Sequence, residues 1–219
     1  MNEQETSSEV RSYSKGRKLT IEIAGAAVFI ALSAIISAAT TSILPRVPGW
    51  GIAFIDPVSI IWLTCFLIFG WRSGLLCTVV GSIILNFFDP TPIIGPIFKF
   101  LATVPFVIVP TISYFIKKKK ESSEKLQDWL KDPKRYTAVS LLGLGLRLVL
   151  TLIFNALLFS TLWSHILPWV SLGFIGLPDV TAWNALIIGV ILINSEQTIW
   201  DTVIPYLITF KLETQKLLP

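Results

Sequence analysis

The chain has 219 residues, of which 53% are hydrophobic and 15% charged, and its mean hydropathy is +0.71. This composition is too apolar for a soluble domain of that length and predicts an integral membrane protein. The formal net charge of +4 is small, and its distribution along the chain carries more information than its size. Cys65 and Cys77 lie in apolar runs without metal-ligand spacing, so we expect buried thiols and neither a metal site nor a cofactor.

Apolar stretches predict an all-α, polytopic membrane protein built as a six-helix bundle. The predicted spans are 20–44, 58–69, 75–88, 97–116, 137–162 and 195–211. The second and third are short for a bilayer core of about 30 Å, which needs roughly 20 residues. The loops between spans are rich in Pro and Gly, and a short surface helix is expected around 126–130.

The last apolar region is too long for one span. Residues 183–210 would extend ~42 Å as a single helix. The polar run 194–198 interrupts the region, and Asn194 with Gln197 three residues later fits a capping box that opens a new helix. We therefore predict a short outer or re-entrant helix at 183–192 before the sixth span.

The distribution of Lys and Arg predicts the orientation. A polar tail at 1–19, the turn at 70–74, the basic loop at 117–136 and the end of the chain carry 15 of the 18 basic residues. Basic residues favour the cytoplasmic side, so both termini are expected in the cytoplasm. The transmembrane domain then covers 20–212, followed by a short cytoplasmic tail at 213–219.

Small residues form a stripe along the first span. Ala24, Ala27, Ala31, Ala34 and Ala38 recur at steps of three and four and therefore share one helix face. Such a stripe marks a helix–helix seam in lipid. The spacing leaves two interpretations open, which are a seam inside this chain and a docking face for another protein.

Charged residues inside membrane spans are costly and are functional candidates. Arg147 and Asp201 lie at about the same height above the cytoplasmic ends of their helices, so a structural ion pair between them is predicted. Glu22 lies within a turn of the cytoplasmic end and is interpreted as an interfacial side chain.

A second group of polar residues lies in the outer half of three spans and predicts a small-molecule pocket that opens outward. Trp50 and Asp89, in the outer loops, complete the set of candidate substrate-binding residues. The set is Trp50, Asp89, Lys99, Asn155, Asn194, Glu196 and Gln197. The competing interpretation is that residues 194–197 only cap a helix.

Enzyme motifs are missing from the sequence. It contains no metalloprotease H-E-x-x-H, no G-x-S-x-G nucleophile turn and no phosphate-binding G-x-x-x-x-G-K-[ST]. The protein is therefore not expected to be an enzyme, and active transport would need a separate nucleotide-hydrolysing subunit.

Several local features together resemble the substrate-binding S components of energy-coupling factor (ECF) transporters, most closely the riboflavin-type branch. They are the run Phe66-Leu67-Ile68-Phe69-Gly70-Trp71-Arg72-Ser73-Gly74, the AxxxA spacing at Ala27–Ala31 and Ala34–Ala38, Asp56-Pro57, and the basic break at 117–120. One feature departs from the riboflavin-type pattern, because no lysine follows Asn194 in the run Asn194-Ser195-Glu196-Gln197.

The resemblance implies a function. S components bind a vitamin at the outer face of the cell membrane and dock, through the alanine face of the first helix, onto a membrane scaffold subunit with two cytoplasmic ATPases. Riboflavin or another B-vitamin is the implied substrate class. Two alternatives are a stand-alone carrier or channel that uses Arg147, Asp201 and Glu196 as a proton relay, and a membrane enzyme acting on lipids, for which the sequence offers few suitable residues.

Overall fold

The computed structural model describes residues 3–40, 43–44, 54–89, 91–121 and 124–214. For residues 3–15 and 119–121 it describes only the backbone. The helices are α1 (Glu3–Thr40), α2 (Pro57–Phe69), α3 (Trp71–Leu85), α4 (Ile94–Thr103), α5 (Pro105–Glu121), α6 (Leu126–Leu130), α7 (Pro133–Ser160) and α8 (Ala182–Tyr206), which η3 (Leu207–Lys211) continues as a π-helical turn. The strands β1 (Ser171–Leu172) and β2 (Leu177–Thr181) pair antiparallel, next to the 3-10 turns η1 (Leu167–Trp169) and η2 (Gly173–Ile175). The predicted helical class is correct, and the small hairpin was not predicted.

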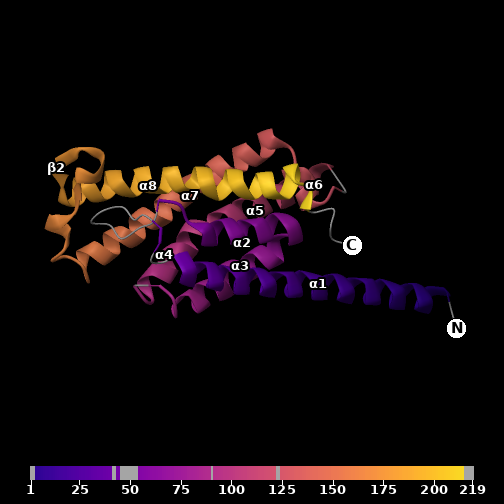
Figure 1. Cartoon of the computed structure of the whole chain (residues 1–219). Helices are drawn as coiled ribbons and strands as arrows, with labels where there is room; N and C mark the ends of the chain where they lie inside the picture. The colour runs from indigo at the N-terminus through magenta and orange to yellow at the C-terminus, as the bar shows by residue number, and fades with distance from the viewer. Residues whose placement is uncertain (1–2, 41–42, 45–53, 90, 122–123, 215–219) are drawn as a thin grey trace.

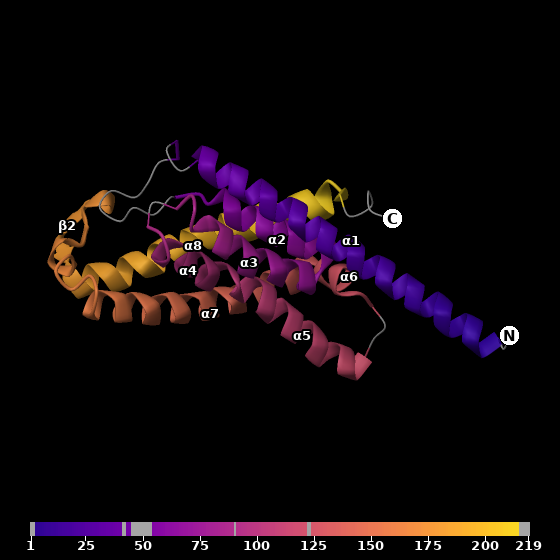
Figure 2. The ribbon, with the colours of Figure 1, turned by 90° about the horizontal axis from the view of Figure 1, so that it is seen from below.

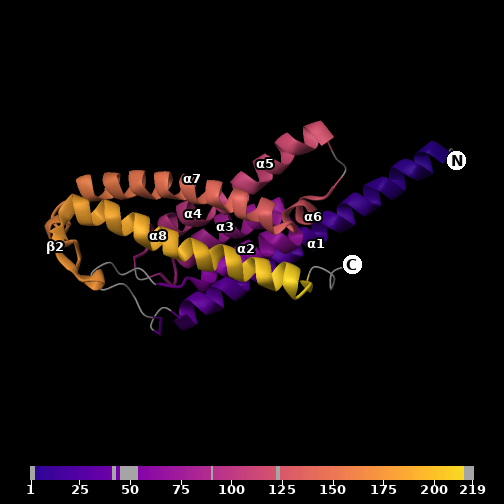
Figure 3. The ribbon, with the colours of Figure 1, turned by 90° about the horizontal axis from the view of Figure 1, so that it is seen from above.

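The helices run roughly along one long axis (Figure 1). The beginning of α1, the short helix α6 and the end of α8 lie at one end of the molecule, and β2 lies at the other. Viewed from below, the first turns of α1 project beyond the rest of the bundle (Figure 2). From the opposite side, α7 and α8 are seen to run together toward the hairpin (Figure 3).

Among the described residues, four helical stretches are long and apolar enough to cross a membrane. They are Gly16–Thr40, Ile94–Lys118, Pro133–Ser160 and Ala182–Lys211. The helices α2 and α3 are apolar but have only 13 and 15 residues. The predicted number of six spans is therefore not established by helix length.

The turn between α2 and α3 consists of Gly70 alone, and α3 begins at Trp71, four residues before the predicted start of that helix. Gly70 has φ 100° and ψ −174°, a region essentially restricted to glycine. A Cβ atom at this position would also lie 2.9 Å from the side-chain nitrogen of Gln127. Glycine therefore allows the tight reversal that packs these two helices against each other.

Two helices begin at an Asp-Pro pair. The side chain of Asp56 accepts a hydrogen bond from the backbone N–H of Val58 (3.0 Å), with Pro57 as the first residue of α2. Asp132 and Pro133 begin α7 in the same way. A carboxylate cap and a proline at the first helical position both favour helix initiation, so both helix starts follow from local sequence.

The predicted break in the last helix is wrong, because α8 runs without interruption through the polar residues 194–198. Asn194 does not cap a new helix, since its side-chain nitrogen donates to the carbonyl of Val190 one turn earlier (2.8 Å). The polar side chains Asn194, Gln197, Thr198 and Asp201 are spaced three or four residues apart and are all buried. They lie on one face because they bind a buried partner on α7, described below.

The first helix packs against α2 and α3 through a face next to the alanine stripe. Ala26 and Ser33 are buried there, the indole N–H of Trp62 donates to Ser33 Oγ (3.0 Å), and the thiol of Cys77 donates to the carbonyl of Ala26 (3.6 Å). In the alanine stripe itself, Ala24, Ala27, Ala31 and Ala38 are exposed and Ala34 is half-buried. The seam with α2 and α3 is thus made by a different face of α1.

The expected helix at 126–130 is present as α6, which exposes Asp128 on one face and buries three residues on the other. Leu126, Trp129 and Leu130 are buried in a hydrophobic cluster with residues of α2, α5 and α7. This cluster holds together the end of the molecule opposite the hairpin. A second cluster, at the hairpin end, packs Leu172 of β1 against Ala185 and Leu186 of α8.

Candidate functional site: an internal cavity

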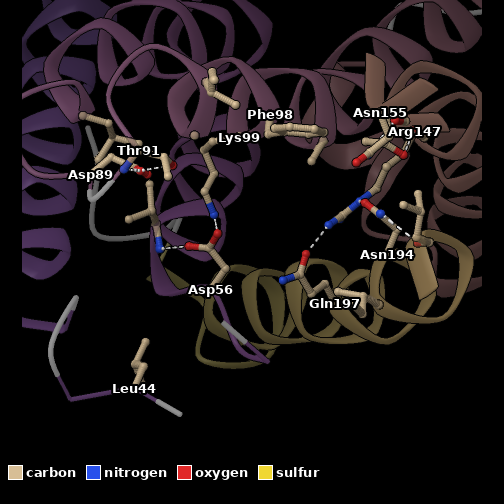
Figure 4. Close-up of a pocket in the computed structure, with 18 of the residues that line it drawn as sticks. Leu44, Asp56, Asp89, Thr91, Phe98, Lys99, Arg147, Asn155, Asn194 and Gln197 are labelled. Carbon is tan, nitrogen blue, oxygen red and sulfur yellow. Dashed lines mark hydrogen bonds and ion pairs between the residues drawn. The ribbon is translucent and has the colours of Figure 1, made fainter. Parts of the chain in front are cut away.

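A cavity of about 770 Å³ lies between α4, α7 and α8 and is also bordered by the end of α1, the start of α2 and the segment after α7. Small-molecule sites in proteins have volumes of roughly 300–1,000 Å³. Polar and charged residues line the cavity at Ser37, Thr40, Asp56, Asp89, Thr91, Lys99, Arg147, Thr151, Asn155, Asn194 and Gln197. Figure 4 shows Lys99 and Asp56 on one side of the opening and Arg147, Asn194 and Gln197 on the other.

The helix α7 supplies one wall through residues spaced four apart. Arg147, Thr151, Asn155 and Phe159 all line the cavity, and Trp163 continues the wall after the helix ends. Twelve residues separate Arg147 from Phe159, which corresponds to ~18 Å along the helix axis. The wall changes from polar at Arg147 to aromatic at Phe159 and Trp163.

Arg147 is the centre of a buried polar network with α8. Its side chain is 1% exposed. Its Nη1 atom lies 2.7 Å from Asp201 Oδ2 and 3.5 Å from Thr198 Oγ1, while Nε donates to Asn194 Oδ1 (2.7 Å) and Nη2 to Gln197 Oε1 (2.7 Å). The ion pair between Arg147 and Asp201 is therefore present in the structure, and Arg147 also forms part of the cavity wall.

This network explains why α8 continues through its polar run. A buried guanidinium must be paired and hydrogen-bonded, because desolvation of an unpaired charge is costly. The residues of α8 that carry oxygen acceptors meet this requirement from a single helix face. A break in the helix at Asn194 would prevent these acceptor residues from lying on one face toward Arg147.

A second ion pair lies on the opposite side of the cavity. The ammonium group of Lys99, on α4, is paired with Asp56 Oδ2, and both side chains are mostly buried. Lys99 Nζ is also 3.4 Å from Ser59 Oγ. Because Asp56 also caps α2, this pair links the start of α2 to the middle of α4 (Figure 4).

Asp89 and Thr91 border the cavity in the connection between α3 and α4. Asp89 Oδ1 accepts hydrogen bonds from the backbone N–H and the hydroxyl of Thr91, both at 2.8 Å. Gly95 allows the close approach of α4 to this carboxylate, since a Cβ atom there would collide with the side chain of Asp89. The loop carboxylate is thus held in a fixed position.

Aromatic side chains supply much of the apolar wall. Phe98 packs edge-on against Phe154 with ring centroids 4.7 Å apart, and Phe159 packs in the same way against Trp163 at 5.5 Å. Edge-to-face packing fixes the rings and leaves flat surfaces available to a ligand. Of these four residues, Phe98, Phe159 and Trp163 line the cavity.

The structure brings most of the predicted substrate-binding residues to this cavity. Asp89, Lys99, Asn155, Asn194 and Gln197 line it. Glu196 is not one of the described residues that line the cavity. It lies on another face of α8, where its carboxylate accepts a hydrogen bond from the indole N–H of Trp200. Trp50 lies outside the described residues.

The sequence analysis missed several cavity residues. Arg147 was assigned to a structural ion pair, or to a proton relay in the alternative carrier, and was not placed among the substrate-binding residues. Asp56 was noted only at the re-entry of a loop, and its pairing with Lys99 depends on tertiary packing. Phe98 and Phe159 carry no signal that separates them from other apolar residues of their helices.

Metal-binding geometry is absent from the described part of the chain, where His, Cys, Asp and Glu form no group of three or more that could hold an ion. The side chains that do converge are amides, hydroxyls, aromatic rings and paired charges. Such an arrangement binds an organic molecule through hydrogen bonds and ring contacts.

These features define a helical membrane protein with an internal cavity of the size of small-molecule sites. Residues 22–210 match the family described as ECF transporter, substrate-specific component, and the chain belongs to this family. It is therefore a substrate-binding subunit of an ECF transporter rather than a member of an enzyme family. No curated protein and no solved structure matches the sequence.

Proposed function

We propose that the chain is the subunit of an ECF-type vitamin importer that captures a B-vitamin, riboflavin or another, at the outer face of the cell membrane. The single observation that carries this proposal is the cavity of about 770 Å³, with aromatic walls and fixed polar groups. A ring system can lie against Phe98 and Phe159 while amides such as Asn155 hydrogen-bond its polar edge. The family membership supplies the context of transport.

The proposed orientation has six membrane-crossing segments, including the shorter α2 and α3, with both termini in the cytoplasm. The excess of Lys and Arg in 1–19 and 117–136 supports it. The beginning of α1, α6 and the end of α8 lie at the same end of the molecule, as this topology requires. The cavity then opens toward the outer side, near the hairpin.

The proposed partners are a membrane scaffold subunit and two cytoplasmic ATPases. The exposed Ala27, Ala31 and Ala38 and the half-buried Ala34 of α1, defined here as the alanine face, are the proposed docking surface for the scaffold. Small side chains allow close backbone approach of a partner helix in lipid. Because α1 packs on α2 and α3 through another face, the alanine face can contact a partner without unpacking the bundle.

The alternative of a stand-alone carrier has weaker support. A proton relay through Arg147, Asp201 and Glu196 would need these groups in sequence along the cavity. Asp201 is 1% exposed behind Arg147, and Glu196 lies away from the cavity lining. This arrangement favours a fixed structural pair over a proton path.

The test is to purify the chain alone, identify any co-purified small molecule by mass spectrometry, and measure vitamin uptake in vesicles. We expect a bound B-vitamin, no uptake by the chain alone, and ATP-dependent uptake once scaffold and ATPase subunits are added. Uptake by the chain alone, without any ATPase, would contradict the proposal and favour the stand-alone carrier.

A further inference from the structure

We propose that the cavity selects a neutral or cationic ring compound that donates hydrogen bonds, and that it rejects organic anions such as carboxylates and phosphates. This inference rests on the proposed function, because it concerns the ligand of the same cavity. It follows from the balance of charge and of hydrogen-bonding groups among the described lining residues.

Among the described lining residues, both cationic side chains are already neutralised by carboxylates of the protein. Lys99 is paired with Asp56, and Arg147 is paired with Asp201 at 2.7 Å. An anionic ligand would have to compete with a fixed carboxylate at either cation. Such competition brings like charges together in a partly buried site, which suppresses binding.

The guanidinium of Arg147 is engaged at all three of its nitrogen atoms. Nε and Nη2 donate to the side-chain oxygens of Asn194 and Gln197, and Nη1 contacts Asp201. A carboxylate or phosphate ligand is normally held by two parallel N–H groups of an arginine. In this cavity both edges of the guanidinium already bind α8, so that mode of anion recognition is blocked.

Two of the described lining residues, Asn155 and Asp89, present oxygen acceptors to a ligand. The amide nitrogen of Asn155 donates to the carbonyl of Thr151 (2.8 Å), and because a carbonyl can only accept, the amide is oriented with Oδ1 available to a ligand donor. Asp89 contributes a carboxylate whose recorded hydrogen bonds come from Thr91. Among the described residues, no ion pair includes Asp89.

The charge balance points in the same direction. Asp56, Asp89 and the Asp201 group behind Arg147 are three carboxylates, against the two cations Lys99 and Arg147. The described residues of the site therefore carry a formal excess of one negative charge, located toward Asp89. A ligand with an N–H, an O–H or a positive charge at that end is complementary to it.

The experiment titrates the purified full-length chain in detergent with vitamin pairs that share a ring system but differ in one acidic group, and follows tryptophan fluorescence. The pairs are riboflavin and riboflavin phosphate, nicotinamide and nicotinate, and thiamine and thiamine phosphate. For any ring system that binds, we expect the member without the acidic group to bind at least about tenfold more tightly. Tighter binding of the acidic member would overturn the inference while leaving the proposed function intact. Equal affinity for both members of every pair that binds would also overturn the inference and leave the proposed function intact.

Asp56→Asn tests the cause of this selectivity. Asparagine caps a helix about as well as aspartate, so α2 should keep its start, but Lys99 loses its counter-charge. We expect the preference for the non-acidic member to shrink severalfold, because the freed ammonium can then attract an anion. The matched control is Asp128→Asn, at an exposed carboxylate on α6 near the other end of the molecule, which should leave the preference unchanged. An unchanged preference in Asp56→Asn would show that the Lys99–Asp56 pair does not exclude anions.

Discussion

At the scale of single residues, Arg147 determines more of the structure than any other charged side chain described. It is held by α8 through three side-chain oxygens at 2.7 Å, and its guanidinium lies 5.7 Å from the ring centroid of Phe106. The network fixes the rotation of α8 relative to α7. It also sets the positions of Asn194 and Gln197 in the cavity wall.

Asp201→Asn should destabilise the protein, because it leaves the Arg147 charge buried without a counter-charge. Removing one partner of a buried ion pair costs about 3–5 kcal/mol. We expect a clear fall in the midpoint of thermal unfolding in detergent, whereas Asp179→Asn, at an exposed position on β2, should have little effect. A double variant, Arg147→Met with Asp201→Leu, should recover much of the lost stability. If Asp201→Asn unfolds at the wild-type temperature, the pair does not have the structural role assigned to it.

Gly70→Ala should also destabilise the protein, for a different reason. Its backbone conformation is essentially restricted to glycine, and a residue forced into such a region costs about 1–3 kcal/mol. Gly145→Ala is a matched control, because a Cβ atom there has no neighbour within 4 Å and alanine is favoured over glycine inside a helix. Equal stability of the two variants in chemical unfolding would contradict this description of the α2–α3 turn.

At the scale of helices, the proposed docking surface on α1, the alanine face, differs from the face of α1 that packs on α2 and α3. The double variant Ala27→Leu with Ala31→Leu should keep the stability and ligand affinity of the isolated chain, because both alanines are exposed. It should lose co-purification with the scaffold subunit, because bulky side chains prevent close backbone approach. Ala39→Leu, at an exposed position on another face of the same helix, is the control and should assemble normally.

Loss of folding in the double variant would instead assign the alanine face to packing within the chain. Normal assembly of the double variant would contradict the proposed docking surface. Both results can be read from one experiment that combines thermal unfolding with affinity purification of the complex.

Most helices could be predicted from the sequence, because apolar runs bounded by Pro, Gly and charged residues are strong local signals. The errors arose where tertiary partners override local patterns. The run 194–198 has the residues of a helix start, yet its polar groups are satisfied by Arg147 from another helix. In a similar way, the sequence of α6 predicts a polar surface segment, whereas the structure places its Trp129 in a buried hydrophobic cluster.

At the scale of the whole molecule, the sequence predicted a polar pocket but not its full composition. Lys99, Asn155 and Asn194 could be found because polar residues inside spans are rare and must face one another. Asp56 could not be predicted as a cavity residue, since its pairing with Lys99 depends on how the start of α2 packs on α4. The aromatic wall could not be predicted either, because the orientation of a phenylalanine in an apolar helix depends on the packing of the entire bundle.

The two ends of the long axis differ in packing. The end that contains α6 is packed by a hydrophobic cluster of large side chains, whereas the cavity lies between α4, α7 and α8 on the way to the hairpin. A closely packed end and a cavity toward the other end suit a subunit that binds its substrate while other subunits hydrolyse ATP. The presence of such a cavity agrees with membership of the ECF substrate-specific component family.

The central claim is that the cavity binds the transported vitamin, and one comparison of two variants by vitamin titration tests it most directly. Ala102 lines the cavity on α4, and Ala156 is exposed on α7. Ala102→Trp should place an indole ring in the cavity and reduce the affinity for the bound vitamin by a hundredfold or more, about 2.8 kcal/mol at ~1.4 kcal/mol per tenfold change. Ala156→Trp should bind as the wild type does. Wild-type affinity in a folded Ala102→Trp variant would contradict the account and place the vitamin elsewhere.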